Sequence, residues 1–293
     1  MSGATHASFA PERRERFARH LVLPEIGPEG QAALADARVL VVGVGGLGAP
    51  VTAYLAGAGL GGLTLVDGGE VRRADLHRQI LYREADVGWP KVEVAAARAR
   101  EVDAALHVEP HATLFTPDTG RDLVRGHDVV IDATDNPATR YLVSDACVLE
   151  DVPLVFGSVS RLEGQVARLV RDRTAEDGAD GNGGRRAPCY RCLHPTAPPP
   201  DSVPSCAEAG VAGPAAGVIG SWMALEALRL AAGTMPAAPE GLVHLDLGTW
   251  TTQRVRIGPR PDCAICGTDP TIDTLVLDEA ACLSGDGFPG FSG

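Results

Sequence analysis

The 293-residue chain has little positive charge and no long apolar run. Lysine and arginine number 26 against 38 aspartate and glutamate residues, which gives a formal net charge of −12. Most of the surface should therefore repel a polyanion, and general nucleic-acid binding is disfavoured. No stretch of about 18 apolar residues predicts a membrane span, and the first residues lack the apolar core of a secretory signal. We expect a soluble, cytoplasmic protein without nucleic-acid or membrane partners, in which basic side chains gather locally around any anionic ligand.

Glycine, in contrast, is abundant, and several glycines lie in the string VVGVGGLG at 41–48. The β-branched run at 39–42 is typical of a parallel strand that is buried on both faces. Gly43, Gly45 and Gly48 then form the pattern G-x-G-x-x-G between this strand and a helix. Such a turn predicts a site for the phosphates and sugar of a nucleotide at the carboxyl edge of a sheet.

Strands are expected to alternate with helices along most of the chain. Strands at 63–66 and 129–131 end at Asp67 and Asp132, and the segment 215–232 is strongly helical. This alternation predicts an α/β fold with a Rossmann-like, doubly wound, mostly parallel sheet. We also expect two short helices before the first strand and additional C-terminal strands, whose sequences are VHLDLGTW and TQRVRIG.

The nucleotide itself is indicated by the residues that follow the second strand. Asp67 is placed to accept hydrogen bonds from ribose hydroxyl groups, and an NAD(P)-dependent oxidoreductase would use the same arrangement. A dinucleotide does not require the basic residues Arg78 and Lys91. An enzyme that attacks the α-phosphate of ATP does require them, because they offset the charge of the departing pyrophosphate. These residues therefore favour ATP over a nicotinamide dinucleotide.

Four of the seven cysteines form two C-x-x-C pairs, Cys189 with Cys192 and Cys263 with Cys266. Four thiolates can complete a tetrahedral zinc shell that has no open position. Such a structural zinc site would stabilise the C-terminal part of the chain rather than take part in chemistry. A thioredoxin-like redox pair is the alternative, but it would leave the second C-x-x-C pair unexplained.

Several strings, which extend from about residue 16 to residue 267, together resemble the MoeB/ThiF adenylyltransferases, relatives of the ubiquitin-activating enzymes. The resemblance implies ATP-dependent adenylation of the C-terminal glycine carboxylate of a small ubiquitin-like sulfur-carrier protein that ends in Gly-Gly. Pyrophosphate would be released, and the carrier would be ready for thiocarboxylate formation. The matching strings are RFARHLVLPEIGPEGQ, VVGVGGLG, DLHRQ, VGWPK, DATDN, EGQV, CYRC, SCAEAGVAGP, GVIGSWMALEAL and CAIC.

The resemblance also implies roles for individual residues. Asp135 matches an aspartate that engages magnesium and the phosphates, although spacing alone leaves Asp132 as an alternative. Arg19 matches an arginine that reaches the ATP site of the neighbouring subunit, which implies a homodimer. Cys206 matches a thiol that some members link to the carrier, whereas others use a separate sulfur donor. The implied catalytic residues are Arg19, Arg78, Lys91, Asp135 and Cys206, and the implied nucleotide contacts are Gly43, Gly45, Gly46, Gly48, Asp67, Arg78, Lys91, Asp135 and Asn136.

Two positions depart from the usual family pattern. Gly69 stands where the second aspartate of D-x-D is usual, and Asp75 stands where the asparagine of S-N-L is usual. Either change could weaken ATP binding or alter metal handling. These departures leave open a catalytically silent protein that binds carriers. A separate alternative within the family is an enzyme that adenylates another peptide C-terminus in natural-product biosynthesis.

The expected organisation has three parts. Helices in residues 1–36 contribute to the dimer and to the partner's active site. An adenylation domain with zinc knuckles spans 37–267, and a tail at 268–293 has no assigned role.

Overall fold

The computed structural model describes residues 9–170, 188–198, 209–235 and 241–277. These residues form an eight-stranded sheet in the order β3-β2-β1-β4-β5-β6-β7-β8. The first five strands in this order pair in parallel, and β6, β7 and β8 continue the sheet as antiparallel strands. The strands are β1 Arg38–Val42, β2 Gly62–Val66, β3 His107–His111, β4 Val129–Asp132, β5 Leu154–Ser160, β6 Glu163–Leu169, β7 Gly241–Asp246 and β8 Thr251–Val255.

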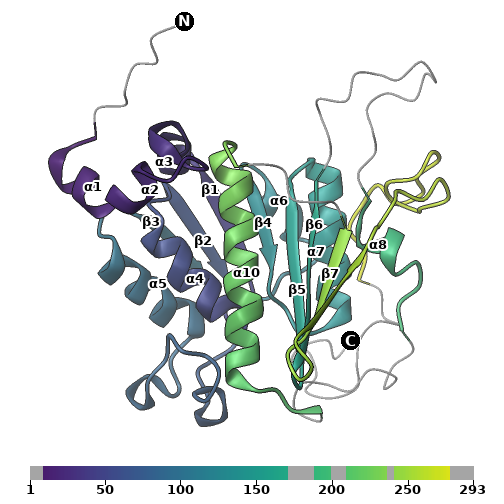
Figure 1. Cartoon of the computed structure of the whole chain (residues 1–293). Helices are drawn as coiled ribbons and strands as arrows, with labels where there is room; N and C mark the ends of the chain where they lie inside the picture. The colour runs from purple at the N-terminus through teal and green to yellow at the C-terminus, as the bar shows by residue number, and fades with distance from the viewer. Residues whose placement is uncertain (1–8, 171–187, 199–208, 236–240, 278–293) are drawn as a thin grey trace, which may run out of the picture.

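Helices cover both faces of this sheet (Figure 1). The long helix α10 crosses one face beside α3, α4 and α5, and α6 and α7 lie on the other. Both layers and the mostly parallel sheet confirm the expected α/β architecture. The helices are α1 Pro11–Arg16, α2 Ala18–Leu21, α3 Gly27–Asp36, α4 Gly48–Gly57, α5 Lys91–Val102, α6 Gly120–Val124, α7 Pro137–Glu150, α8 Tyr190–Leu193 and α10 Gly213–Ala232.

Strand β1 shows why a continuous apolar run forms the centre of the sheet. Val39 and Val41 pack into the hydrophobic core under α4 and α10, whereas Leu40 and Val42 pack into the core under α7. Successive side chains of a strand point to opposite faces, so a strand that is covered on both sides needs apolar residues at every position. The prediction that this strand is buried on both faces is confirmed.

Three details differ from expectation. The N-terminal segment contains three helices instead of two, because the chain breaks at Phe17 between α1 and α2. Strands β3, β5 and β6 were not predicted, and β5 and β6 pair as an antiparallel hairpin. Helix α10 is long and apolar enough by length and composition to cross a membrane, contrary to the expectation of no such run, but half of its most apolar window is buried inside the protein. Its hydropathy is explained by packing, since Ile219 and Met223 lie fully buried against the sheet.

Candidate functional site

The glycine turn after β1 forms the floor of a cavity of about 780 Å³ at the carboxyl edge of the sheet. Gly43 has a φ of +87°, and a Cβ on it would lie 2.9 Å from the carbonyl oxygen of Ala133. A Cβ on Gly48 would collide with the carbonyl oxygen of Gly43. Gly45 and Gly46 have more room and line the cavity, so this part of the turn leaves its backbone accessible to a ligand.

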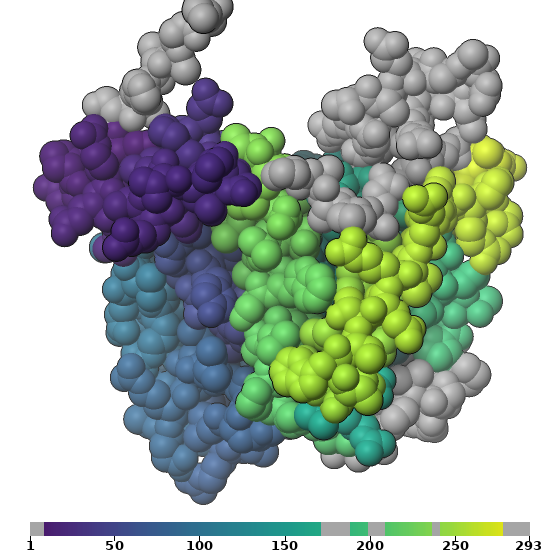
Figure 2. Space-filling view, viewed as in Figure 1, coloured from purple at the N-terminus to yellow at the C-terminus, as the bar shows by residue number. Residues whose placement is uncertain are grey.

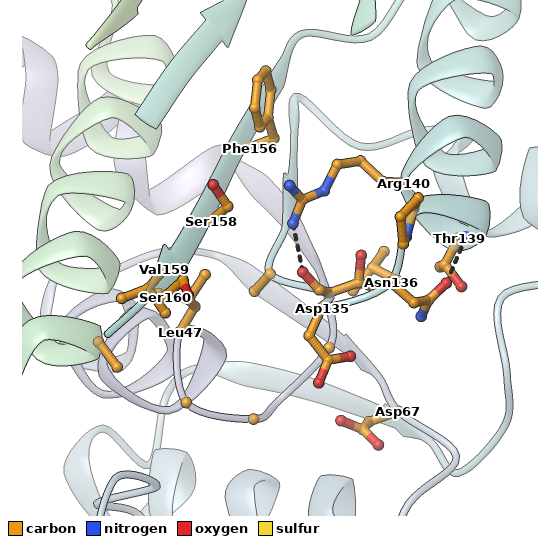
Figure 3. A pocket seen from close by; sticks show the side chains of 18 of the residues that line it. Leu47, Asp67, Asp135, Asn136, Thr139, Arg140, Phe156, Ser158, Val159 and Ser160 are labelled. Carbon is orange, nitrogen blue, oxygen red and sulfur yellow. Dashed lines mark hydrogen bonds between the residues drawn. The ribbon is translucent and has the colours of Figure 1, made fainter. Parts of the chain in front are cut away.

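Asp67 fixes this turn to the end of β2. Its Oδ2 accepts a hydrogen bond of 2.8 Å from the amide of Val44, and its Oδ1 accepts one of 2.8 Å from the amide of Gly69. Figure 3 shows the carboxylates of Asp67 and Asp135 on the same side of the cavity. The structure therefore places Asp67 beside the glycine turn, where its carboxylate holds that turn through two backbone amides.

The predicted basic residues meet on the wall next to the glycine turn. Arg78 and Lys91 come from the loop after β2 and from the start of α5, and both line the cavity. Their side chains are only 19% and 11% exposed. Carbon atoms of the Arg78 side chain lie 3.6 Å from where a Cβ on Gly46 would stand, so the guanidinium stem covers the turn. Sequence spacing predicted this cluster, and the fold brings it together.

The surroundings of Asp75 were not predicted from the sequence. The residue was noted only as a departure, yet its fully buried carboxylate pairs with both basic residues. Its Oδ1 accepts a hydrogen bond of 3.1 Å from Arg78, and its Oδ2 lies 3.7 Å from Nζ of Lys91. The basic wall of the cavity therefore contains its own counterion.

The two candidate aspartates after β4 have different surroundings. Asp132 is fully buried; its Oδ1 accepts hydrogen bonds from the amide and the hydroxyl of Thr134, and its Oδ2 lies 3.2 Å from Nε of Arg140. Burial raises the pKa of Asp132, and Arg140 and Thr134 counteract only part of that effect. Asp135 is exposed and lines the cavity. Of the two, Asp135 is the one that can meet a phosphate-bound metal ion.

Arg140 is a site residue that the sequence analysis missed. It lies in the first turns of α7, and its guanidinium donates hydrogen bonds of 2.6 and 2.9 Å to the carbonyl oxygens of Thr134 and Gly157. These bonds join the loop that carries Asp135 to strand β5. Figure 3 shows the hydrogen bond from Arg140 to this loop. The string DATDNPATR held a signal for its position. Asn136 caps α7 by accepting a hydrogen bond from the amide of Thr139, and this cap starts the helix just before Arg140.

Aromatic residues form the wall opposite the glycine turn. The guanidinium carbon of Arg140 lies 5.7 Å from the ring centre of Phe156 and 5.9 Å from that of Tyr190. The Tyr190 ring meets the Phe156 ring edge-on at 5.3 Å. Because Tyr190 stands between Cys189 and Cys192, the first cysteine pair is packed directly against the cavity wall. Sequence patterns gave no indication of this contact.

The four cysteines of the two pairs converge as predicted. Their sulfur atoms lie within 4.8 Å of one another, and closest approaches of 3.3, 3.4 and 3.5 Å join members of different pairs. A tetrahedral zinc ion with Zn–S bonds of about 2.3 Å places sulfur atoms roughly 3.8 Å apart. Hydrogen bonds from the thiols of Cys189 and Cys266 lower the pKa of Cys192. The donor set and its spacing fit zinc, and the cluster fixes the segment after β8 to α8.

One predicted catalytic residue, Arg19, does not line the cavity of its own chain. Arg19 is exposed on α2, and Figure 1 shows α1, α2 and α3 around the C-terminal end of α10. The loop that carries Arg78 lies at the other end of that helix. A Cβ on Gly213, the first residue of α10, would contact the carbonyl oxygen of His77 in that loop. Cys206 lies outside the residues that the structure describes. The same is true of residues 278–293 of the predicted tail at 268–293.

Comparisons with known proteins agree with this geometry. The profile of the ThiF family matches residues 17–265. The adenylyltransferase and sulfurtransferase MOCS3 of Bos taurus is 46% identical over 280 residues, which cover 95% of this chain and 58% of that protein. The sulfur carrier protein adenylyltransferase of Thermus thermophilus is 42% identical over 94% of this chain and 98% of its own length. A crystal structure of E. coli MccB superposes with a TM-score of 0.73 at 20% identity, covering 88% of this chain and 73% of that one, and shares the fold.

Proposed function

This chain belongs to the ThiF family, and from that premise we propose that it adenylates the C-terminal glycine carboxylate of a small ubiquitin-like sulfur-carrier protein with ATP. The observation that carries the proposal is the cavity beside the glycine turn. Arg78 and Lys91 line it, and the two acids Asp67 and Asp135 line it as well. The Thermus thermophilus relative, which this chain matches over 98% of its length, is named for that activity. A nicotinamide dinucleotide would leave the paired basic residues without a task.

The reaction needs charge compensation and alignment more than proton transfer. An oxygen of the carrier's terminal carboxylate attacks the α-phosphorus of ATP and forms an acyl-adenylate. The bond between that phosphorus and its bridging oxygen breaks, and pyrophosphate leaves with the electron pair. Arg78 and Lys91 lie where they would offset the charge on the departing phosphates, and Asp67 would hold the ribose so that the α-phosphate faces the incoming carboxylate.

The proposed metal ions have separate tasks. Asp135 would hold magnesium, which would supply positive charge that offsets the charge of the phosphates. Its position agrees with this role, because it is exposed to the cavity and stands on a loop that Arg140 fixes to β5. The four-cysteine cluster would hold zinc as a structural ion.

The aromatic wall suggests where the carrier's tail passes. The cavity extends from the glycine turn to Phe156 and Ser158 on β5 and to Tyr190 on α8. A Gly-Gly terminus suits such a route, because a segment without side chains can approach a phosphate closely. For the next step we propose that a sulfur nucleophile, either the thiol of Cys206 or the terminal sulfur of a separate persulfide donor, attacks the acyl carbon of the adenylate. A C–S bond forms, the C–O bond to AMP breaks, and AMP leaves with the electron pair.

Carrier-dependent exchange of labelled pyrophosphate into ATP tests the proposed activity. The purified chain should catalyse exchange only when a carrier with a free Gly-Gly carboxylate is present, because the adenylate forms only with that acceptor. A carrier whose C-terminus is amidated is the matched control and should give none. Exchange with an unrelated peptide in place of the carrier would identify a peptide-modifying member of the family. No exchange with any acceptor, in protein that binds ATP, would support a silent carrier-binding protein instead.

We also propose a homodimer in which Arg19 completes the partner's site. We further propose that the domain boundaries lie at residues 36 and 267, and that the protein is cytoplasmic. The position of Arg19 supports this arrangement, because α2 lies at the end of α10 remote from the basic wall of its own chain (Figure 1). The space-filling view shows the N-terminal helices at one edge of the molecule, beside the end of α10 (Figure 2). In the proposed dimer this edge would contact the second subunit.

Mixed dimers would show whether Arg19 acts across the interface. Arg19→Ala and Asp135→Ala should each be inactive alone. Co-expressed, half of randomly formed dimers would be mixed and would contain one intact site of two, so activity should recover to roughly a quarter of the wild-type value. If Arg19 acts within its own chain, each site of a mixed dimer lacks one residue and activity stays at background.

A further inference from the structure

Asp75 lies behind the basic wall of the cavity and has no exposed surface. It ends the short 3-10 turn Arg73–Asp75, and its Oδ2 accepts a hydrogen bond of 3.0 Å from the amide of Arg72. Arg78 donates to Oδ1 at 3.1 Å, and Nζ of Lys91 is 3.7 Å from Oδ2. The carboxylate therefore sits on the far side of the two cations from the space that a ligand would enter.

The surroundings of the carboxylate favour its ionised form. Burial alone would raise the pKa of Asp75, but Lys91, the amide of Arg72 and the guanidinium groups of Arg72 and Arg78 outweigh burial and lower the pKa. At neutral pH the negative charge of Asp75 thus cancels part of the positive charge that the wall presents. A ligand phosphate must compete with this charge for the same two cations.

We propose that Asp75 is a built-in counterion that holds Arg78 and Lys91 in position and weakens the affinity of the pocket for pyrophosphate, so that this product is released. The inference rests on the proposed function, because it concerns the phosphates of the same site. Asp75 is a positioning residue in this scheme: it acts through the two cations and does not touch the substrate.

Gly69 provides an independent way to place a carboxylate at the same cations. A Cβ on Gly69 would lie 3.6 Å from Nζ of Lys91. Gly69 does not have a positive φ, so its backbone can accept a side chain. It would lie 3.1 Å from Oδ1 of Asp67, so the Asp67 side chain must shift slightly to admit it. Gly69→Asp would therefore bring a new acid to Lys91, and Gly69→Ala is its matched control for the added bulk.

Calorimetric titration of the full chain with sodium pyrophosphate, ATP and AMP tests the proposal. Asp75→Asn keeps the shape of the side chain and removes its charge. We expect pyrophosphate and ATP to bind about 10-fold more tightly to this variant, because the removed charge acts at short range on the two cations that meet the phosphates. AMP, which lacks the β- and γ-phosphates, should bind with an unchanged Kd. Gly69→Asp in the Asp75→Asn background should return the pyrophosphate Kd toward the wild-type value.

The outcomes separate this inference from the proposed function. Pyrophosphate binding to folded Asp75→Asn that is unchanged or weaker overturns the inference, while wild-type binding of ATP leaves the proposed function standing. If Asp75→Asn does not fold, Gly69→Asp alone decides, since it should bind pyrophosphate more weakly than Gly69→Ala; equal affinities overturn the inference. A wild-type protein that binds neither ATP nor AMP overturns the proposed function, and the inference with it.

Discussion

Replacing Asp135 with asparagine should reduce carrier-dependent pyrophosphate exchange by about 100- to 1000-fold, which is typical for the loss of one charge-stabilising contact at a reacting phosphate. The side chain is exposed in the cavity, and Asn136, not Asp135, caps α7, so the fold should be unaffected. The melting temperature should therefore stay within a degree or two of the wild-type value. Exchange rates and thermal unfolding, measured on the same preparation, check both parts.

Asp132→Asn is the matched control, since it changes the same functional group three positions earlier. Asp132 is fully buried and pairs with Arg140, so its loss leaves a buried guanidinium without its carboxylate. We expect the free energy of unfolding to fall by about 3 kcal/mol, with a lower melting temperature as the principal effect. Normal exchange in Asp135→Asn would remove Asp135 from the mechanism, and a silent, fully stable Asp132→Asn would point to Asp132 as the metal contact.

Removing the metal from the four-cysteine cluster should have the largest effect on stability. Zinc binding to a closed thiolate site contributes directly to the free energy of folding. We expect the apoprotein to lose about 5 kcal/mol, which for a chain of this size lowers the melting temperature by roughly 10 °C. Cys192→Ser should show the same loss, together with a lower zinc content by elemental analysis.

Cys147 offers a matched control for the cysteine variants. It is buried in the same hydrophobic core but is not part of the cluster of four. Cys147→Ala should retain its zinc and still lose stability when the metal is chelated, whereas Cys192→Ser should be insensitive to chelator. A wild-type apoprotein with an unchanged melting temperature would count against the four-thiolate site.

The packing of Tyr190 suggests that metal loss also disturbs the cavity. Tyr190 stands between Cys189 and Cys192, and its ring contacts both Phe156 and the guanidinium of Arg140. Arg140 in turn holds the loop that carries Asp135. The sequence analysis assigned the cysteines to stability alone, and this chain of contacts joins the cysteine cluster to the cavity.

The features that sequence predicted well are those whose cause is local. A β-branched run, a glycine turn that requires a positive φ at Gly43, and two C-x-x-C pairs each carry their physical reason within a few residues. The antiparallel hairpin of β5 and β6 was missed because its pairing joins strands that differ little in pattern from other apolar segments. Asp132 and Asp135 could not be separated, because spacing along the chain does not reveal which carboxylate a neighbouring arginine will neutralise.

The sequence by itself determined the class of fold, the glycine turn, the basic pair Arg78 and Lys91, and the two C-x-x-C pairs, because each depends on short-range geometry or on residue type. Only the tertiary structure decided which charges cancel. It buries Asp132 against Arg140. It buries Asp75 against the basic pair, and it leaves Asp135 facing the cavity. The physical reason is that electrostatic interactions depend on distance and burial, and both are set when remote segments fold together.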